Sequence, residues 1–315
     1  MIFDTTELKR RADYEEYMRN FIQQCIEKRS THVYKIKYQF DIFSILNKLI
    51  FILNHAGRHK SLKELIQLSQ LNCLYNKIVD LKLFEKSIVT FCDAHPEDNL
   101  ISQALKKNDC TTYTLQHGYY TYSPGTINQE VYENFISDYM LCWGASSVTN
   151  LIGCGISASR LIPFGYFKKT QLCYQSGDAV FILLNGRHNS QTNNALLDLA
   201  RRIIKDTGMR VYIKKHPDDI NTYPGSEDIV FVDTLYDGTR HARLAIISES
   251  GVFVDFYMAG FPYLILKSDG LKKEFSSLPN AFSSDEIIDY IKCNSKIENT
   301  NYPELVKLES DFESL

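Results

Sequence analysis

Short apolar runs alternate with polar or amphipathic segments along most of this 315-residue chain, and this alternation constrains its fold most strongly. Runs of this length between turn residues predict buried strands, and the intervening segments have helical spacing. The expected strands are 33–38, 87–92, 111–115, 139–142, 179–184, 209–213, 229–232, 244–247 and 262–266. The expected helices between and after them are 99–107, 146–151, 194–205, 252–259 and 284–292. Strand, helix and strand in alternation is typical of βαβ units, so we predict an α/β protein with parallel sheets.

The alternation forms two series separated by a polar segment. Residues 168–177 lack periodicity, which predicts an interdomain linker. We therefore expect one Rossmann-like domain over residues 1–167 and a second over residues 178–315, facing a common cleft. Ahead of the first clear series, further helices are expected over 5–30, up to about 54, and from a cap at Ser61 to about 68.

Composition excludes several classes of protein. The formal net charge is −3 and the lysines are scattered, so no nucleic-acid partner is expected. Eight cysteines occur without a Cys-x-x-Cys pair, which predicts reduced thiols in a cytoplasmic protein rather than disulfides or a zinc site. The first residues contain no apolar signal segment, which also indicates a cytoplasmic protein.

Phe40 to Leu53 is the most apolar stretch of the chain. Asp41, Asn47 and Lys48 interrupt it, and it is too short to span a bilayer. Its spacing favours a buried or half-buried helix. The same spacing is compatible with a surface that touches the inner face of the cytoplasmic membrane.

The second half of the chain contains a lysine- and histidine-rich strand end. Lys214-Lys-His216-Pro217 follows the expected strand 209–213, and proline holds the preceding histidine in an extended conformation. The imidazole can then donate a hydrogen bond to a phosphate. The alternative is that His216-Pro217 forms an ordinary surface turn without a binding role. Open α/β sheets bind ligands at the carboxyl ends of their strands, so we expect Lys214, His216 and Pro217 at a donor site.

A serine-rich turn ends the next strongly apolar strand. In Ser248-Glu249-Ser250-Gly251, backbone N–H groups, two hydroxyls and a helix dipole can face one anion, although serine is also a common helix cap. Arg187, in Asn185-Gly-Arg-His188, can fork onto a phosphate or lie in a solvated loop. Features of this kind at neighbouring strand ends predict a diphosphate-binding site.

The first half contributes Gln116-His117-Gly118 directly after the expected strand 111–115. Together with His216-Pro217, and with the serine-rich turn that leads to Asp255 and Pro262, this order of motifs resembles the GT-B-fold transferases of bacterial surface polysaccharides. The families that it resembles are the CDP-glycerol glycerophosphotransferases of teichoic acid synthesis, sialyl- and polysialyltransferases with a His-Pro motif, and capsule glycosyltransferases. The resemblance covers about residues 86–292.

The resemblance implies a GT-B fold with an acceptor-side N-terminal domain and a donor-binding C-terminal domain. It implies that His117 lies on the acceptor side as base or phosphate ligand, and that His216, Ser248 and Ser250 hold the phosphates of the donor. The chain departs from these families in two ways. The acidic Asp/Glu-Asp/Glu-Gly motif of the sialyltransferases is missing from the N-terminal half, and Glu249 stands where the teichoic acid enzymes often have serine.

The chain contains no Asp-x-Asp motif, so we expect protein groups, with no metal or cofactor, to neutralise the leaving nucleotide. An acceptor hydroxyl needs a base, and the candidates in order are His117, Asp93 and Glu130. A structural histidine and a simple turn at Asp93 are the alternatives. The residues expected to bind the acceptor, unless they only pack in the fold, are Gln116, Gly118, Tyr119 and Tyr120.

We therefore predict an inverting, metal-independent glycosyltransferase. It would move a sugar from a nucleotide-sugar donor to a lipid-linked or oligosaccharide acceptor of a growing capsular or cell-wall polysaccharide. Transfer of glycerol- or alditol-phosphate from a CDP donor is the near alternative. A non-catalytic nucleotide-binding subunit and a sugar-nucleotide 2-epimerase are further alternatives, and the epimerase would turn over its substrate without an acceptor.

Overall fold

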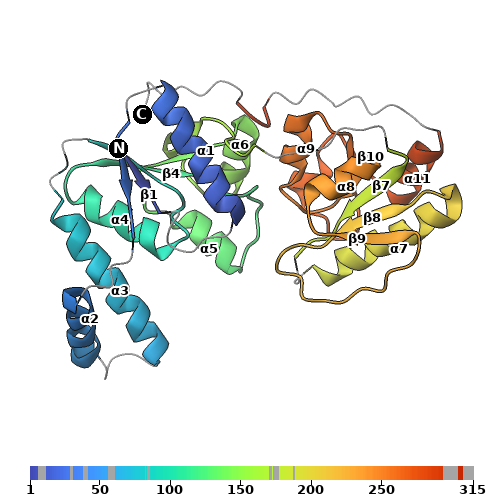
Figure 1. Ribbon diagram of the computed structural model, residues 1–315. Coiled ribbons are helices and arrows are strands. Elements are labelled where there is room, and N and C mark those ends of the chain that lie inside the picture. Colours follow the sequence, from blue (N-terminus) through green and yellow to red (C-terminus); the bar gives the residue numbers. More distant parts are fainter. Residues whose placement is uncertain are drawn as a thin grey trace. The chain divides into compact units, whose positions relative to one another are not determined.

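The chain forms two compact units, Met1–Lys168 with Glu304–Leu315 (unit 1) and Lys169–Pro303 (unit 2). Figure 1 shows the computed structural model, in which each unit is a layered α/β structure. The residues that the structure describes are 1–5, 12–28, 31–37, 42–55, 61–81, 83, 86–169, 172, 177–186, 189–293 and 304–307.

Unit 1 is built on a six-stranded sheet in which all strands are parallel. Its strands are β1 (Ile2–Asp4), β2 (Val33–Lys35), β3 (Ser87–Thr90), β4 (Thr111–Leu115), β5 (Tyr139–Cys142) and β6 (Leu161–Pro163). They lie in the order β2-β1-β3-β4-β5-β6, so the chain changes direction across the sheet between β1 and β3. Strand β1 was not predicted from the sequence, because it is only three residues long and precedes a polar stretch.

Helices cover both faces of this sheet. They are α1 (Ala12–Lys28), α2 (Ile42–His55), α3 (Leu62–Val79), α4 (Pro96–Lys106), α5 (Ile127–Glu133) and α6 (Ala145–Gly153), with a short 3-10 turn at Ala158–Arg160. Successive side chains of an extended segment point to opposite faces of the sheet. Ile88 of β3 belongs to a core with α3 and α4 on one face, and Phe91, just after β3, contacts the rings of Tyr14 and Tyr17 of α1 on the other.

Helices α2 and α3 form a hairpin that leaves part of α2 exposed. Figure 1 shows α2 alongside α3, and α3 in turn packs against α4. Ser61 caps α3 as expected, its side chain accepting a hydrogen bond from Glu64 N, but the helix continues to Val79, well beyond residue 68. The half-buried helix expected over Phe40–Leu53 is present from Ile42 as α2, which packs against α3 and leaves its other face exposed, with Leu53 at 76%. Residues 40 and 41 lie outside the described residues. None of the described helices is both long and apolar enough to cross a membrane.

Unit 2 has a second six-stranded parallel sheet, with the order β12-β11-β10-β7-β8-β9. Its strands are β7 (Ala179–Leu183), β8 (Val211–Lys214), β9 (Ile229–Val232), β10 (Ala242–Ile247), β11 (Tyr263–Leu266) and β12 (Ala281–Phe282). Its helices are α7 (Ser190–Thr207), α8 (Leu235–His241), α9 (Phe253–Ala259), α10 (Lys273–Ser276) and α11 (Ser284–Lys292). From β7 the chain adds strands toward β9 at one edge, and from β10 it adds them toward β12 at the other edge. The strand order therefore reverses between the central strands β7 and β10.

The described end of the chain, Glu304–Lys307, packs on unit 1 and not on unit 2. Ser146 N donates to Glu304 O (2.8 Å) and Lys307 N donates to Trp143 O (2.8 Å). A Cβ on Gly144 would lie 2.6 Å from Glu304 O, so only glycine allows this close approach. The expected second domain of 178–315 therefore has to be corrected at its C-terminal end, where nonlocal backbone contacts decide the position of the tail.

Candidate functional site

The carboxyl edge of the unit 2 sheet combines a change of chain direction with several of the residues singled out from the sequence. Ligands of open α/β sheets bind where the strand order reverses, which here is between β7 and β10. Ile182 of β7 pairs with Ile246 of β10, and Leu183 pairs with Lys214 of β8. Continuing this register places Asn185 level with His216 on one side and with Glu249, next to Ser248, on the other.

Asn185 has the chemistry of a ligand-binding residue. It is 2% exposed, yet its side-chain Nδ2 and Oδ1 find no hydrogen-bond partner among the described residues. Its backbone is fixed, because Asn185 N donates to Asn193 Oδ1 (2.7 Å) and Asn193 Nδ2 donates to Asn185 O (3.0 Å). Buried amides are nearly always hydrogen-bonded, so the Asn185 amide has capacity to bond a further polar group at this strand end.

Sequence reasoning singled out the Asn185-Gly-Arg-His188 segment for its glycine and for Arg187, and it did not weigh Asn185 itself. Arg187 and His188 lie outside the described residues. The signal that could have pointed to Asn185 is its position, since a polar residue directly follows the buried strand at the centre of the unit.

The His216 turn lies next to Asn185. The His216 Nδ1 contacts Asp218 Oδ1, which orients the ring through one nitrogen and leaves Nε2 as the other hydrogen-bonding atom. A Cβ on Gly186 would lie 2.8 Å from Asp218 Oδ1, which shows how close this turn comes to the end of β7. Pro217 is exposed, and Lys214 Nζ donates to Lys215 O (3.1 Å).

The serine-rich turn lies at the expected strand end, but its groups are used differently from the prediction. Ser250 N donates to Ser248 O (2.9 Å), and Glu249 Oε1 accepts a hydrogen bond from Lys272 N (3.0 Å), so Glu249 holds a neighbouring loop. The following helix α9 begins only at Phe253 and has seven residues, which gives little support to a helix-dipole site beginning at Gly251. Ser248 is fully buried, and its hydroxyl donates to Leu266 O (3.4 Å).

In unit 1, His117 follows β4 and is oriented by two polar side chains at one ring nitrogen. His117 Nδ1 lies 2.7 Å from Tyr120 Oη and 3.0 Å from Cys92 Sγ at the end of β3. A hydroxyl and a thiol can each donate or accept, so the ring can carry its proton on either nitrogen. Burial raises the pKa of Tyr120 well above its ordinary value, so its hydroxyl stays protonated at neutral pH.

Aromatic rings surround His117, which is partly exposed. Its ring lies edge-on to Tyr14 with centroids 5.7 Å apart, and Tyr14 makes a similar contact with His95 at 6.0 Å. Tyr120 is buried and stacks on Tyr132 with ring centroids 4.2 Å apart. Tyr120 therefore orients His117 from within the core, which differs from the expected role as an acceptor-binding surface.

Gln116 and Gly118 have structural contacts. Gln116 is buried, its Nε2 donates to Gly118 O (2.7 Å), and its Oε1 accepts from Trp143 N (2.8 Å). Both ends of the amide thus hold the backbone around His117 in place. A Cβ on Gly118 would meet only ordinary contacts, and Tyr119 is partly exposed beside it.

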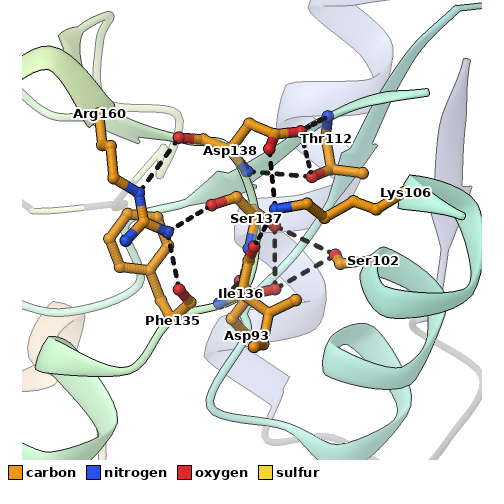
Figure 2. Close-up of polar contacts among 9 residues, drawn as sticks. All are labelled: Asp93, Ser102, Lys106, Thr112, Phe135, Ile136, Ser137, Asp138 and Arg160. Atoms are coloured by element: carbon orange, nitrogen blue, oxygen red, sulfur yellow. Dashed lines mark hydrogen bonds and ion pairs between the residues drawn. The ribbon is translucent and has the colours of Figure 1, made fainter. Parts of the chain in front are cut away.

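Asp93 is the centre of a buried polar network, which Figure 2 shows. Its Oδ2 accepts from Ile136 N (2.8 Å) and Ser137 N (2.6 Å), and its Oδ1 accepts from Ser137 Oγ (3.1 Å) and Ser102 Oγ (3.3 Å). Burial raises the pKa of Asp93, and these hydrogen bonds act in the opposite direction. Four donors occupy the carboxylate, an arrangement that favours a structural role.

The segment held by Asp93 is fixed from other directions as well. Arg160 Nη2 donates to Phe135 O (2.8 Å) and Ser137 O (2.7 Å), and Lys106 Nζ forms an ion pair with Asp138 Oδ1 (2.8 Å) (Figure 2). These contacts fasten the loop that precedes β5.

The third candidate base, Glu130, lies in the first turn of α5 and is exposed. Its neighbour Gln129 faces inward instead, donating to Cys154 O (3.0 Å). Among the three candidate bases, His117 is partly exposed, and its ring is oriented by Tyr120 and Cys92. Among the described residues, no group of three or more His, Cys, Asp or Glu side chains is arranged to hold a metal ion.

The sequence and the structure were compared with those of known proteins. No protein-family model matches the sequence, and no curated protein matches it. Many solved structures resemble it in fold, among them the three that follow. The UDP-N-acetylglucosamine 2-epimerase from Rickettsia bellii is 13% identical with a TM-score of 0.57, over 96% of this chain and 91% of that one. The UDP-GlcNAc 2-epimerase from Methanocaldococcus jannaschii is 13% identical with a TM-score of 0.58, over 96% and 92%.

The third structure is the lipopolysaccharide outer core galactosyltransferase WaaB, which is 10% identical with a TM-score of 0.53, over 99% of this chain and 96% of that one. At these identities the likeness shows the fold alone. The predicted fold class is confirmed: the chain is an α/β protein of GT-B type, with two Rossmann-like units that each contain a parallel six-stranded sheet. The finer assignment to families of surface-polysaccharide transferases stays a prediction.

Proposed function

We propose that the protein is a nucleotide-sugar enzyme that binds the diphosphate of its donor at the carboxyl edge of the unit 2 sheet. The observation that carries this proposal is the buried amide of Asn185, which has no hydrogen-bond partner among the described residues and lies at the point where the strand order reverses. An amide buried without a partner costs about 1–3 kcal/mol, a cost that a bound phosphate or sugar hydroxyl would remove. His216 Nε2 is the second group proposed to donate to the donor.

The favoured reaction is transfer of the sugar with inversion to an acceptor hydroxyl of a surface glycan, without a metal ion. His117 would take the acceptor proton at Nε2 while Tyr120 or Cys92 accepts a hydrogen bond from its Nδ1–H. A base oriented by a second group is the common arrangement for activating a weak nucleophile. The acceptor oxygen bonds to the anomeric carbon as the bond from that carbon to the diphosphate breaks, and the nucleoside diphosphate leaves with its charge held by protein groups.

A specific observation favours a second candidate, a sugar-nucleotide 2-epimerase. The 2-epimerases named above share the fold over more than nine-tenths of both chains. The structure of the Methanocaldococcus jannaschii 2-epimerase was solved with UDP-GlcNAc and UDP. A shared fold does not fix the reaction, so the two candidates have to be separated by their products.

Product analysis distinguishes the candidates. UDP-GlcNAc and CDP-glycerol are each incubated with the protein in EDTA, with and without a lipid extract from polysaccharide-producing bacteria as acceptor, and the nucleotides are resolved by chromatography. We expect UDP release that depends on the extract and survives EDTA. Conversion of UDP-GlcNAc to its C2 epimer without the extract would establish the epimerase, and CMP release from CDP-glycerol would establish the alditol-phosphate transferase. Activity restored only by Mg²⁺ or Mn²⁺ would contradict the metal-independent mechanism.

Replacing Asn185 separates a binding role from a structural one. Asn185→Leu removes an unsatisfied buried amide, so we expect the ligand-free protein to become about 1 kcal/mol more stable, while its affinity for UDP falls about 10- to 100-fold. The matched control is Asn193→Leu, because Asn193 is equally buried but both of its amide groups are bonded. That variant should lose about 2 kcal/mol of stability. Equal destabilisation by both substitutions in urea unfolding would show that Asn185 is structural.

A further inference from the structure

Helix α2 presents an uncharged apolar face to solvent. Five aliphatic side chains on it are 46–76% exposed: Ile45, Leu46, Leu49, Ile50 and Leu53. Their spacing of three, four and one residues places them on one side of the helix. Single exposed aliphatic residues need no explanation, but a contiguous group of five on one helix marks an interaction surface.

The opposite face of α2 is already occupied. Phe51 is half-buried there, and α2 packs against α3, which lies between it and α4 (Figure 1). A further exposed aliphatic residue is Leu62 at the start of α3, which is 65% exposed. The exposed face is therefore not the side by which the hairpin attaches to unit 1.

The hairpin also differs in charge from the rest of the chain. Between residues 42 and 66 the sequence contains four cationic side chains, Lys48, Arg58, Lys60 and Lys63, and one anionic side chain, Glu64. This local excess of positive charge lies within a chain whose formal net charge is −3. The helix α2 itself contains no acidic residue.

From these two properties we infer that the α2–α3 hairpin docks on an anionic lipid surface, with the five aliphatic side chains of α2 entering the boundary between headgroups and acyl chains. An apolar helix face with neighbouring cations is the composition of interfacial helices, whose affinity combines buried apolar area with attraction to anionic lipids. A second copy of the chain is a poorer occupant, because a two-fold interface brings each patch against itself and would place the cations of the two hairpins together. The inference does not depend on the proposed function.

Vesicle sedimentation tests this docking without any assay of activity. The whole protein is mixed with vesicles of phosphatidylcholine and phosphatidylglycerol, or of phosphatidylcholine alone, at low and high salt. We expect binding to the anionic vesicles that weakens at high salt. The double variant Leu49→Gln/Leu53→Gln should bind at least about tenfold more weakly at an unchanged melting temperature, since both side chains are exposed.

Ile220→Gln is the matched control, because Ile220 is an aliphatic residue 82% exposed in unit 2, and this variant should bind like the wild type. Either of two results overturns the inference: wild type that stays in the supernatant with anionic vesicles at low salt, or a double variant that binds as the wild type does. A third result would assign the face to contact between copies. This is a wild-type dimer in light scattering that the double variant converts to monomer, without vesicle binding by either protein.

Discussion

His117→Asn should lower kcat by about 10² to 10⁴, with little change in donor affinity. A positioned general base contributes a factor of this size, which corresponds to about 3 to 5 kcal/mol of barrier. Asparagine keeps a similar shape and can hydrogen-bond to Tyr120, but it cannot take a proton. The measurement is the initial rate of nucleotide release from the donor, together with calorimetric titration of UDP.

The control for this substitution is His95→Asn. Both histidines contact the ring of Tyr14, but His95 is the N-cap residue of helix α4, whereas the His117 ring lies against Cys92 Sγ and Tyr120 Oη. We expect His95→Asn to change kcat by less than about threefold. If His117→Asn reduces kcat less than about fivefold, His117 is not the base, and Glu130 becomes the candidate to test next.

Asp93→Ala should lower the free energy of unfolding by about 3 kcal/mol. The substitution leaves the buried N–H groups of Ile136 and Ser137 without an acceptor, and each such group costs about 1–3 kcal/mol. Asp93→Asn should lose about 1 kcal/mol or less, because its oxygen can accept from the two N–H groups while its NH₂ donates to the hydroxyls of Ser102 and Ser137. Urea unfolding of both variants gives these values.

Activity of the Asp93→Asn variant separates the structural role from the catalytic one. The network in Figure 2 indicates that Asp93 holds the loop before β5 in place. We therefore expect the asparagine variant to retain kcat within a few-fold. A folded Asp93→Asn protein whose kcat falls about a hundredfold would instead make Asp93 the base, since that is the loss expected when proton transfer is removed.

The sequence predicted the strands well, because a buried strand in a parallel sheet is a local apolar run. The bounds of β4, β5 and β9 are those expected. Helix α8 was missed because it is short and contains Gly238, a residue that weakens helix propensity. A Cβ at Gly238 would lie 2.2 Å from the ring of Phe181, so the glycine allows the helix to pack on β7.

Roles of individual residues could be predicted less well than their positions. Asp93 and His117 were both placed correctly at strand ends, but their contacts depend on partners far along the chain. Asp93 is bonded to Ser137, 44 residues away, and His117 to Cys92, 25 residues away. Neither pairing leaves a local signal in the sequence. The same is true of Asn185, because only the structure shows that its amide is buried without a partner among the described residues.

Thermal unfolding of the wild-type protein with UDP, CDP, CMP, GDP or dTDP tests the central claim, that unit 2 binds the diphosphate of a nucleotide donor, most directly. A nucleotide at about 100 times its Kd stabilises the protein that binds it by about 2.7 kcal/mol. We predict a melting temperature that rises with the concentration of at least one nucleoside diphosphate, and a much smaller rise in Asn185→Leu. A wild-type melting temperature unchanged by all five nucleotides, or a rise of equal size in Asn185→Leu, would contradict the account.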